Sequence, residues 1–252
     1  MARTDSLTNF LTDVADAIRS KTGKSDLIPC ENFDIEIESI SGGGGGGLPD
    51  AYQEVEYIKG TGTQYINTNF YASGGMRAEY EVEYGSDIQT INGGYIVGSH
   101  NTGSPYARNG GLYNNYRNVK GWELGYGDYY PNYPATITYD QKYKVEFQTI
   151  VGDAYLKVDG TTLVTDTRTT NMTANTAVML FTNQIGITQT KTIAKVFYVK
   201  VWDKDGNLVR DFIPCYRKTD NAIGMYDLVN NVFYGNAGTG TFEKGNDVTP
   251  NS

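Results

Sequence analysis

The 252-residue chain has few of the residues that build disulfide frameworks or histidine-dependent active sites. It contains two cysteines, Cys30 and Cys215, and one histidine, His100. Two distant cysteines are a poor basis for a disulfide framework, so we expect free thiols, as in a protein that folds in a reducing cytoplasm. A serine hydrolase needs a histidine base, and His100 lies in no recognisable motif of that kind. We therefore expect a protein that is not an enzyme and needs no cofactor.

The chain also lacks long apolar runs and an excess of basic residues. No segment approaches the roughly 18 apolar residues of a membrane span, and the polar N-terminus lacks the apolar core of a signal peptide. Its 21 basic residues are outnumbered by 29 acidic ones, so it offers no basic surface for phosphate backbones. We expect neither a membrane nor a nucleic-acid partner.

Six consecutive glycines at residues 42 to 47 separate two kinds of sequence. Glycine has no side chain to bury and loses much backbone entropy on ordering, so such a run is suited to a linker. The alternative is a glycine-rich loop inside one domain. Because the pattern changes from helical to strand-like across the run, we predict a small N-terminal segment (1 to 41), a linker (42 to 47) and one β-domain (48 to 252).

Apolar residues in the N-terminal segment recur at the three-four spacing of an amphipathic helix, beginning at Leu7. A second helical turn is expected after Pro29. The segment is too small to bury its apolar stripes against itself, so we expect it to associate with copies of itself or with another protein. The residues predicted to serve attachment or oligomerisation are Leu7, Phe10, Leu11, Val14, Ile18, Phe33, Ile37 and Ile40.

The stretch LTDVADAIRSKTGK at residues 11 to 24, followed by FDIEIESI at 33 to 40, resembles an N-terminal module of virion proteins from bacteriophages and prophages of Gram-positive bacteria. That resemblance implies attachment to other virion structural proteins, exposure of the β-domain at the virion surface, and assembly in the bacterial host cytoplasm. Such virion proteins are commonly homotrimers, so a trimer is expected. A position on the head or on the tail is left open.

After residue 48 the pattern turns to period two. Residues 76 to 84 alternate apolar with charged side chains, which predicts an antiparallel strand with one buried face. Further strands are predicted at 143 to 151, 154 to 158, 177 to 181, 193 to 202 and 208 to 213. Hairpin turns are expected at Asp159-Gly160 and Asn230-Asn231. Many strands without intervening helices predict a mainly β protein, a sandwich or jelly roll.

Five stretches at the two ends of this region resemble concanavalin A-like, laminin-G-like domains. They are YIKGTGTQYINT (57 to 68), FYVKVWD (197 to 203), LVRDFIPCYRK (208 to 218), IGMYDLVNNVFY (223 to 234) and NAGTGTF (236 to 242). The resemblance implies two stacked antiparallel sheets in a family in which carbohydrate binding is common but not universal. Some such domains hold calcium, and Asp87, Asp128, Asp153 and Asp159 are available donors, although their spacing places no calcium site.

Tyrosines concentrate between residues 106 and 143, where nine of the 21 lie with Trp122 and five asparagines. This part is the least strand-like, so we expect a loop. Aromatic rings stack on sugar rings while amides bond hydroxyl groups, which makes the segment a candidate glycan site. A protein interface and packing within the domain remain alternatives. The candidate residues are Tyr113, Asn114, Asn115, Tyr116, Trp122, Tyr126, Tyr129, Tyr130 and Tyr133.

Two residues outside this segment are expected to have no binding role. Trp202 lies in an alternating apolar strand and is expected in the core, and His100 is expected in a loop with no assigned task. The sequence thus favours a phage surface protein, a tail or head fibre of receptor-binding type, that displays a β-sandwich to host-surface glycans. The alternatives are a capsid or tail decoration protein without glycan binding, and a glycan-cleaving enzyme, for which no facing pair of carboxylates is recognisable in the β-domain.

Overall fold

The computed structural model divides into two compact units, Met1–Pro49 and Asp50–Ser252. It describes residues 7–22, 26–33, 48–86, 94–101, 107–116, 119–129, 131–169, 173–183 and 192–249. The six glycines lie outside these ranges. Within them, no helix combines the length and the apolar character that crossing a membrane would require.

The first unit contains the helix α1 (Leu7–Thr22) and the short 3-10 helix η1 (Cys30–Asn32). The three-four spacing of apolar residues therefore predicted α1 correctly. η1 follows Pro29, whose carbonyl accepts a hydrogen bond from the Asn32 N–H at 2.9 Å. The helical turn expected after Pro29 is thus present as a single 3-10 turn.

The apolar residues of α1 differ in exposure along the helix. Ala15 and Ile18 are buried, whereas Leu7 and Phe10 are 73% and 59% exposed. The N-terminal end of α1 therefore presents apolar side chains that the described residues of this unit do not cover. Of the other residues predicted for attachment, the half-buried ones are Leu11, Val14 and Phe33, and those outside the described residues are Ile37 and Ile40.

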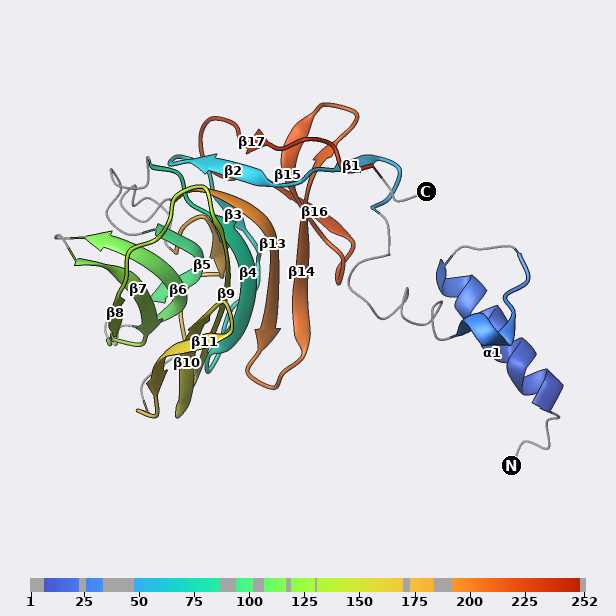
Figure 1. Cartoon of the computed structure of the whole chain (residues 1–252), viewed down its shortest axis with the longest axis horizontal. Helices are drawn as coiled ribbons and strands as arrows, with labels where there is room; N and C mark the ends of the chain where they lie inside the picture. Colours follow the sequence, from blue (N-terminus) through green and yellow to red (C-terminus); the bar gives the residue numbers. More distant parts are fainter. Residues whose placement is uncertain are drawn as a thin grey trace. The chain divides into compact units, whose positions relative to one another are not determined.

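The second unit is an antiparallel sandwich of two sheets, shown face to face in Figure 1. The larger sheet consists of β1 (Tyr52–Glu54), β2 (Ile58–Thr61), β4 (Met76–Glu83), β9 (Lys142–Ile150), β10 (Asp153–Val158), β11 (Thr161–Asp166), β13 (Ile193–Asp203), β14 (Leu208–Arg217), β15 (Ala222–Asp227), β16 (Val232–Gly235) and β17 (Glu243–Lys244). The smaller sheet consists of β3 (Ile66–Asn67), β5 (Gly94–Asn101), β6 (Ala107–Tyr116), β7 (Val119–Tyr126), β8 (Asn132–Pro134) and β12 (Met179–Leu180). The predicted mainly β fold with a small N-terminal helix is confirmed.

The order of strands in each sheet follows from long-range antiparallel pairing. In the large sheet the main path is β11-β10-β9-β4-β13-β14-β15-β16, and in the small sheet it is β3-β12-β5-β6-β7-β8. Tight turns connect the hairpins at the predicted dipeptides, where Asp159, Gly160 and Asn231 have positive φ angles of 48°, 76° and 56°. Asparagine, aspartate and glycine tolerate this left-handed conformation better than other residues, which is why these dipeptides marked turns.

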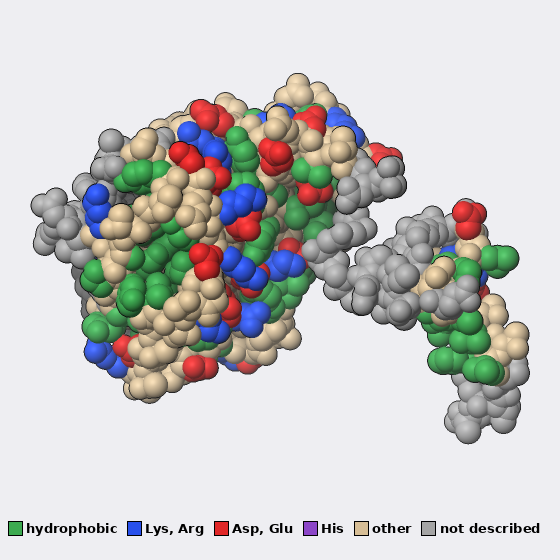
Figure 2. Space-filling model, viewed as in Figure 1, with side chains coloured by type: hydrophobic (Ala, Val, Ile, Leu, Met, Phe, Trp, Pro, Cys, Tyr) green, Lys and Arg blue, Asp and Glu red, His purple; other side chains and the backbone are tan. Residues whose placement is uncertain are grey.

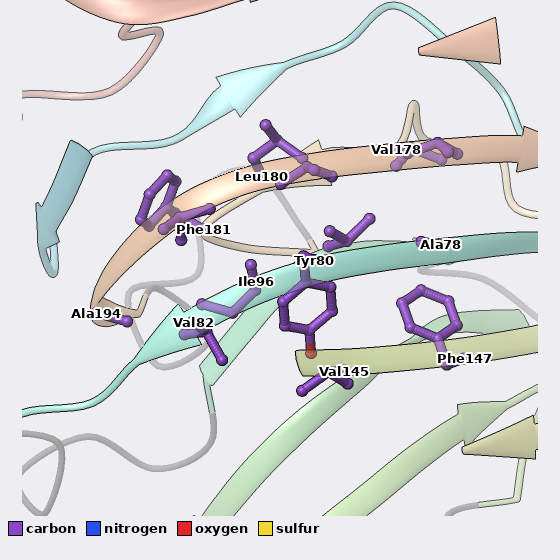
Figure 3. Close-up of a cluster of buried hydrophobic side chains, with 14 of the residues drawn as sticks. Ala78, Tyr80, Val82, Ile96, Val145, Phe147, Val178, Leu180, Phe181 and Ala194 are labelled. Atoms are coloured by element: carbon purple, nitrogen blue, oxygen red, sulfur yellow. The ribbon is translucent and has the colours of Figure 1, made fainter. Parts of the chain in front are cut away.

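The core lies between the inner faces of the two sheets. β4 is buried at every second residue, so Ala78, Tyr80 and Val82 face inward while the charged residues between them face outward. Figure 3 shows these side chains meeting Ile96 of the small sheet and Phe147 of β9. The Tyr80 hydroxyl donates a hydrogen bond to the carbonyl of Gly111 at 2.9 Å, which links the sheets through a buried polar group. Period-two patterning therefore located the core correctly.

Both cysteines are free thiols, as predicted. Cys30 is exposed in the N-terminal unit, and Cys215 is buried in β14. Burial raises the pKa of the Cys215 thiol to about 12, and the nearby Glu54 carboxylate contributes to the same shift. The Cys215 thiol is therefore protonated at neutral pH and poorly nucleophilic.

The tyrosine-rich segment between residues 106 and 143 is not the loop that we expected. Most of it forms β6, β7 and β8, three neighbouring strands of the small sheet. Glycine and asparagine, which are unfavourable in strands on average, hid the period-two pattern. At Gly111 a Cβ atom would lie 2.9 Å from Phe147 Cδ1, so the close approach of the two sheets requires glycine there.

Candidate functional site

Tyr113 and Trp122, both predicted to contact a glycan, lie in the core. Each is 3% exposed. Their rings pack edge to face with centroids 5.4 Å apart, and Trp122 also packs against Tyr143 at 5.6 Å. The Tyr113 hydroxyl donates to the Ala135 carbonyl at 3.2 Å. Both rings belong to the hydrophobic core between the two sheets and not to an outer face, so the prediction of glycan contact is wrong for these two residues: they stabilise the fold.

Tyr126 is also a structural residue. Its side chain is fully buried. The hydroxyl donates to the Arg168 carbonyl at 2.5 Å and accepts a hydrogen bond from the Gly152 N–H at 2.9 Å. Tyr126 therefore fastens the β9–β10 turn and the segment after β11 to the small sheet. The prediction of glycan contact is wrong for this residue as well, because its polar group is already used.

Two predicted tyrosines remain at the surface. Tyr133 is 44% exposed on β8. Tyr129 is half-buried, and the Arg168 guanidinium lies 3.6 Å from its ring centroid. That contact occupies one ring face, which leaves Tyr133 as the more accessible of the two. Of the remaining candidates, Tyr130 and the side chains of Asn114, Asn115 and Tyr116 lie outside what the structure describes.

The outer face of the small sheet carries a row of three glycines in register. Gly98 of β5 pairs with Gly110 of β6, which pairs with Gly125 of β7. Neighbours on the sheet alternate between the two faces, and the flanking Asn109 and Gly111 face inward toward Thr149 and Phe147. The glycine row therefore lies on the face turned away from the core, where it forms a flat floor across three strands.

Tyr95 lies over this floor. A Cβ atom at Gly110 would be 2.6 Å from Tyr95 Cδ1, and one at Gly98 would be 2.8 Å from the same carbon. At Gly125 it would be 3.2 Å from the Tyr95 hydroxyl oxygen. The ring therefore extends along the row from β5 toward β7, and a larger side chain at Gly98 or Gly110 would displace it. We call Tyr95 and the three glycines the glycine face.

Polar side chains surround the glycine face. The Arg108 Nε–H donates to His100 Nε2 at 3.2 Å, so that imidazole nitrogen acts as an acceptor. His100 lies within β5 and is 8% exposed, so its expected position in a loop is wrong. Glu123 of β7 pairs with Leu112 in the next row of the same face. The set combines an aromatic ring with a cation, an imidazole and a carboxylate.

Two amides beside the glycine face have buried atoms without a hydrogen-bond partner. Asn183 is 2% exposed, and its Oδ1 atom has no hydrogen-bond partner among the described residues. Its Cβ lies 2.9 Å from the position that a Cβ would take at Gly98, which places it on this face. On the other side, neither amide atom of Asn132 has a partner, although both are buried. Such groups are rare in folded proteins, because each forgoes the hydrogen bonds that water would provide.

The outer face of the large sheet is different, because its charges pair with one another. Glu79 pairs with Lys144 at 3.1 Å, Glu81 with Lys142 at 2.8 Å, and Glu83 with Lys195. Figure 2 shows basic and acidic side chains interleaved on the surface of the second unit, Asp50–Ser252. The compensated pairs suit a solvated face, so these three lysines indicate no ligand.

Trp202 belongs to this outer face and not to the core, so the prediction of a core position is wrong. The register between β13 and β4 shifts between Val196 and Tyr198, and Trp202 pairs with the outward-facing Arg77. Trp202 is half-buried, and the Arg77 guanidinium lies 3.9 Å from the centroid of its ring system. A bulge that strand patterning does not reveal thus turned the indole toward solvent.

No group of three or more histidine, cysteine, aspartate or glutamate side chains converges as a metal site within the described ranges. Asp159 accepts a hydrogen bond from the Lys144 N–H at 2.8 Å, and Asp153 accepts one from the Gln148 amide at 2.8 Å. Two of the four aspartates named as calcium donors therefore serve strand turns. Asp128 is exposed, and Asp87 lies outside the described residues.

The sequence analysis did not predict Tyr95, which is part of the glycine face, or Asn183, which lies beside Gly98. A signal did exist: Gly98, Gly110 and Gly125 interrupt strands, and such glycines mark a close approach of other atoms. Only the strand register brings them into one row.

No protein-family model and no curated protein matches this chain. Among solved structures, a Bacteroides ovatus protein described as a carbohydrate-binding candidate matches 79% of this chain, with 11% identity and a TM-score of 0.51. Domains LG4-5 of the mouse laminin α1 chain match 70% of it, with 13% identity and a TM-score of 0.40. A Trypanosoma rangeli sialidase matches 78% of it, with 14% identity and a TM-score of 0.41.

These matches span 62%, 48% and 36% of the lengths of those three proteins, in that order. With 11% identity, the Bacteroides match shows a common fold and nothing finer. The chain therefore shares a β-sandwich fold with that protein, in agreement with the concanavalin A-like expectation.

Proposed function

We propose that the β-domain is a non-enzymatic carbohydrate-binding module whose site is the glycine face. The observation that carries the proposal is the buried, unpartnered Oδ1 atom of Asn183 beside Tyr95 and the glycine floor. A buried acceptor without a partner destabilises the folded protein by about 1–3 kcal/mol, so its retention needs an explanation. A sugar hydroxyl that donates to Asn183 would supply one.

The other groups around the face suit the same ligand. Tyr95 offers an aromatic surface for a sugar ring, and Asn132 offers a second amide at the β8 side. The strands β12 to β8 span four gaps of about 4.8 Å, or about 19 Å, so an oligosaccharide would lie across the strands. Tyr95 is 4% exposed, so binding requires local opening of the surface, and association is expected to be slow.

The test is a binding screen with host-wall and capsular polysaccharides on the full chain and on the Asn183→Ala variant. Removing an unpartnered acceptor should leave the free energy of unfolding unchanged or higher, while glycan affinity falls about tenfold or more. Affinity would be measured by calorimetry and stability by urea unfolding.

The matched control is Tyr133→Ala, which removes the most accessible residue of the predicted tyrosine site. We expect it to leave both affinity and stability within experimental error of the parent protein. If Tyr133→Ala abolishes binding and Asn183→Ala does not, the site lies on β8 and the proposal fails. If the folded parent binds no glycan in the screen, the proposal fails for the whole domain.

For the N-terminal unit we propose attachment to a phage particle and association of three copies of the chain. The supporting observation is the exposure of Leu7 and Phe10, two large apolar side chains one helical turn apart. Multivalent display would raise the avidity of weak single-site glycan binding. Light scattering of the full chain tests this: the parent should be trimeric, and the double variant Leu7→Ser, Phe10→Ser should be monomeric. A monomeric parent protein would refute the trimer.

A second function, decoration of a capsid or tail without glycan binding, is favoured by one observation. Tyr95 is 4% exposed, so the glycine face is buried. If it binds no glycan, the only role of Tyr95 is to pack on the outer side of the small sheet. In that case Tyr95→Ala destabilises the domain and no polysaccharide binds to the parent protein.

A further inference from the structure

Arg77 differs from the other cations on the outer face of the large sheet. Each lysine of β9, β10 and β13 on this face has a carboxylate within ion-pair distance; these are Lys142, Lys144, Lys157, Lys195 and Lys200. Arg77, at the start of β4, has no ion pair with any described residue. Its Nε–H is buried and has no hydrogen-bond partner in the part of the chain that the structure describes. On a face where charge is otherwise compensated, one guanidinium is left with an unused donor.

The guanidinium is held in place by Trp202. Its central carbon lies 3.9 Å from the centroid of the Trp202 ring system, a distance at which the cation stacks on the aromatic face. Stacking restricts the side chain, so less entropy is lost when a ligand binds its planar array of donors. A guanidinium held in this way is suited to a planar anion that accepts two parallel hydrogen bonds. Because the Nε atom is buried, a contact through its N–H requires local opening around Arg77.

The residues beside Arg77 suit a sugar. Strand register places Tyr155, Gln148, Arg77 and Trp202 in one row across β10, β9, β4 and β13. Three strand gaps of about 4.8 Å put the two aromatic residues about 14 Å apart. Gln148 is fixed by two hydrogen bonds from its Nε2 atom to Asp153, at 2.9 and 2.8 Å. Lys157 Nζ, 4.3 Å from the Tyr155 ring centroid, occupies one face of that ring. The row therefore offers a cation between two aromatic residues, with the other face of Tyr155 left to a ligand.

We propose that this row, which we call the Arg77 row, binds a carboxylate-bearing sugar residue of a polysaccharide, separately from the glycine face. A carboxylate matches the two-donor geometry of a guanidinium. The net charge of −8 and the neighbouring carboxylates disfavour a dense polyanion. The expected ligand is thus a largely neutral polysaccharide with spaced uronic acid residues. The proposal rests on Arg77 and Trp202 and does not require that the glycine face bind a glycan.

The experiment uses the full chain and two tetrasaccharides, one with a single glucuronate residue and one with glucose in its place. By calorimetry the parent protein should bind the acidic tetrasaccharide about tenfold or more tightly than the neutral one. Arg77→Gln should remove this preference, and Arg77→Lys should remove most of it, because an ammonium lacks the planar fork. Lys144→Gln, which removes an ion-paired cation of the same face, should preserve it.

A second measurement does not depend on how the variants fold. In the parent protein, the NMR resonance of the Arg77 Nε–H should shift on addition of the acidic tetrasaccharide and not of the neutral one. Equal affinity for the two tetrasaccharides, or an unchanged Arg77 resonance at saturation, overturns the proposal. Binding of inorganic phosphate with equal affinity overturns the carboxylate assignment. Asn183→Ala separates the two sites, since it should leave the preference for the acidic tetrasaccharide unchanged.

Discussion

On the outer face of the large sheet, lysines pair with carboxylates, whereas the outer face of the small sheet carries glycines, a buried tyrosine and amides without partners. Both sheets contribute their inner faces to one core, so the difference lies outside it. Paired charges are typical of a strand face that is exposed to solvent, and they need no ligand. Buried polar atoms without partners are what folding alone disfavours. Among the described residues, three of the five such side-chain atoms belong to Asn132 and Asn183 beside the small sheet, and one is Arg77 Nε of the large sheet. The small sheet is therefore where a binding role is expected first.

Substitutions of the two tryptophans should give the largest change in the free energy of unfolding. Trp122, on the inner side of the small sheet, is 3% exposed and packs against Tyr113 and Tyr143. Trp122→Ala should lower the free energy of unfolding by about 3–5 kcal/mol, because it opens a cavity in the core. Trp202→Ala, on the outer side of the large sheet, should cost less than half as much. Urea unfolding of the three proteins measures both effects.

A loss of glycan binding in Trp122→Ala would therefore carry no information about the binding site unless the variant is shown to be folded. Near-ultraviolet circular dichroism provides that control. If Trp202→Ala proves as destabilising as Trp122→Ala, the outer face of the large sheet is part of the core and the comparison fails.

The glycine row gives the next largest effect. A Cβ at Gly110 would lie 2.6 Å from Tyr95 Cδ1 and 2.8 Å from the Val97 carbonyl oxygen. Gly110→Ala should thus cost about 1–3 kcal/mol through overpacking, since neither the ring nor the backbone can move freely. Gly235→Ala in β16 is the control, because its Cβ would meet only Phe233 at 3.5 Å. A melting temperature for Gly110→Ala equal to that of Gly235→Ala would show that Tyr95 is not held on the floor.

Two buried asparagines distinguish used amides from unused ones. Asn109 receives a hydrogen bond from Thr149 Oγ1 at 2.9 Å and donates to Ser99 Oγ at 3.1 Å. Asn109→Ala should destabilise the domain by about 1–3 kcal/mol, because it leaves buried partners unsatisfied. Asn183→Ala should cost nothing measurable. The difference between their urea midpoints checks this, and equal losses would mean that Asn183 has a structural role.

The fold was predictable from the sequence where one strand face is charged and the other is apolar. β4 is buried at every second residue because Arg77, Glu79, Glu81 and Glu83 cannot be placed in the core. Turn residues with positive φ, such as Asn231, fixed the hairpins. The segment from 106 to 143 gave no such contrast, since both faces of β6 are buried from Asn109 to Tyr113 and glycine replaces the expected apolar side chains at Gly110 and Gly111.

The candidate site was less predictable, because tyrosine serves both cores and binding surfaces. Tyr113 and Tyr126 satisfy their hydroxyls with backbone groups, so their polar ends did not require solvent. Tyr95 and Asn183 are 88 residues apart in the sequence and meet only through the order of strands in the small sheet. Local composition therefore pointed to the strands of the small sheet, whereas the residues of the proposed site are brought together only by strand register.

The ion pairs of the large sheet give the smallest effect and test the other side of the comparison. Lys144 lies 3.1 Å from Glu79, and its side chain is 54% exposed. Solvent screens such a pair, so Lys144→Gln should lower the free energy of unfolding by less than about 1 kcal/mol. In about 1 M salt the loss should vanish, because the Debye length falls to about 3 Å. Urea unfolding at low and high salt measures this. A loss above about 2 kcal/mol that persists in salt would mean that the fold requires this ion pair. The outer face of the large sheet would then no longer contrast with that of the small sheet.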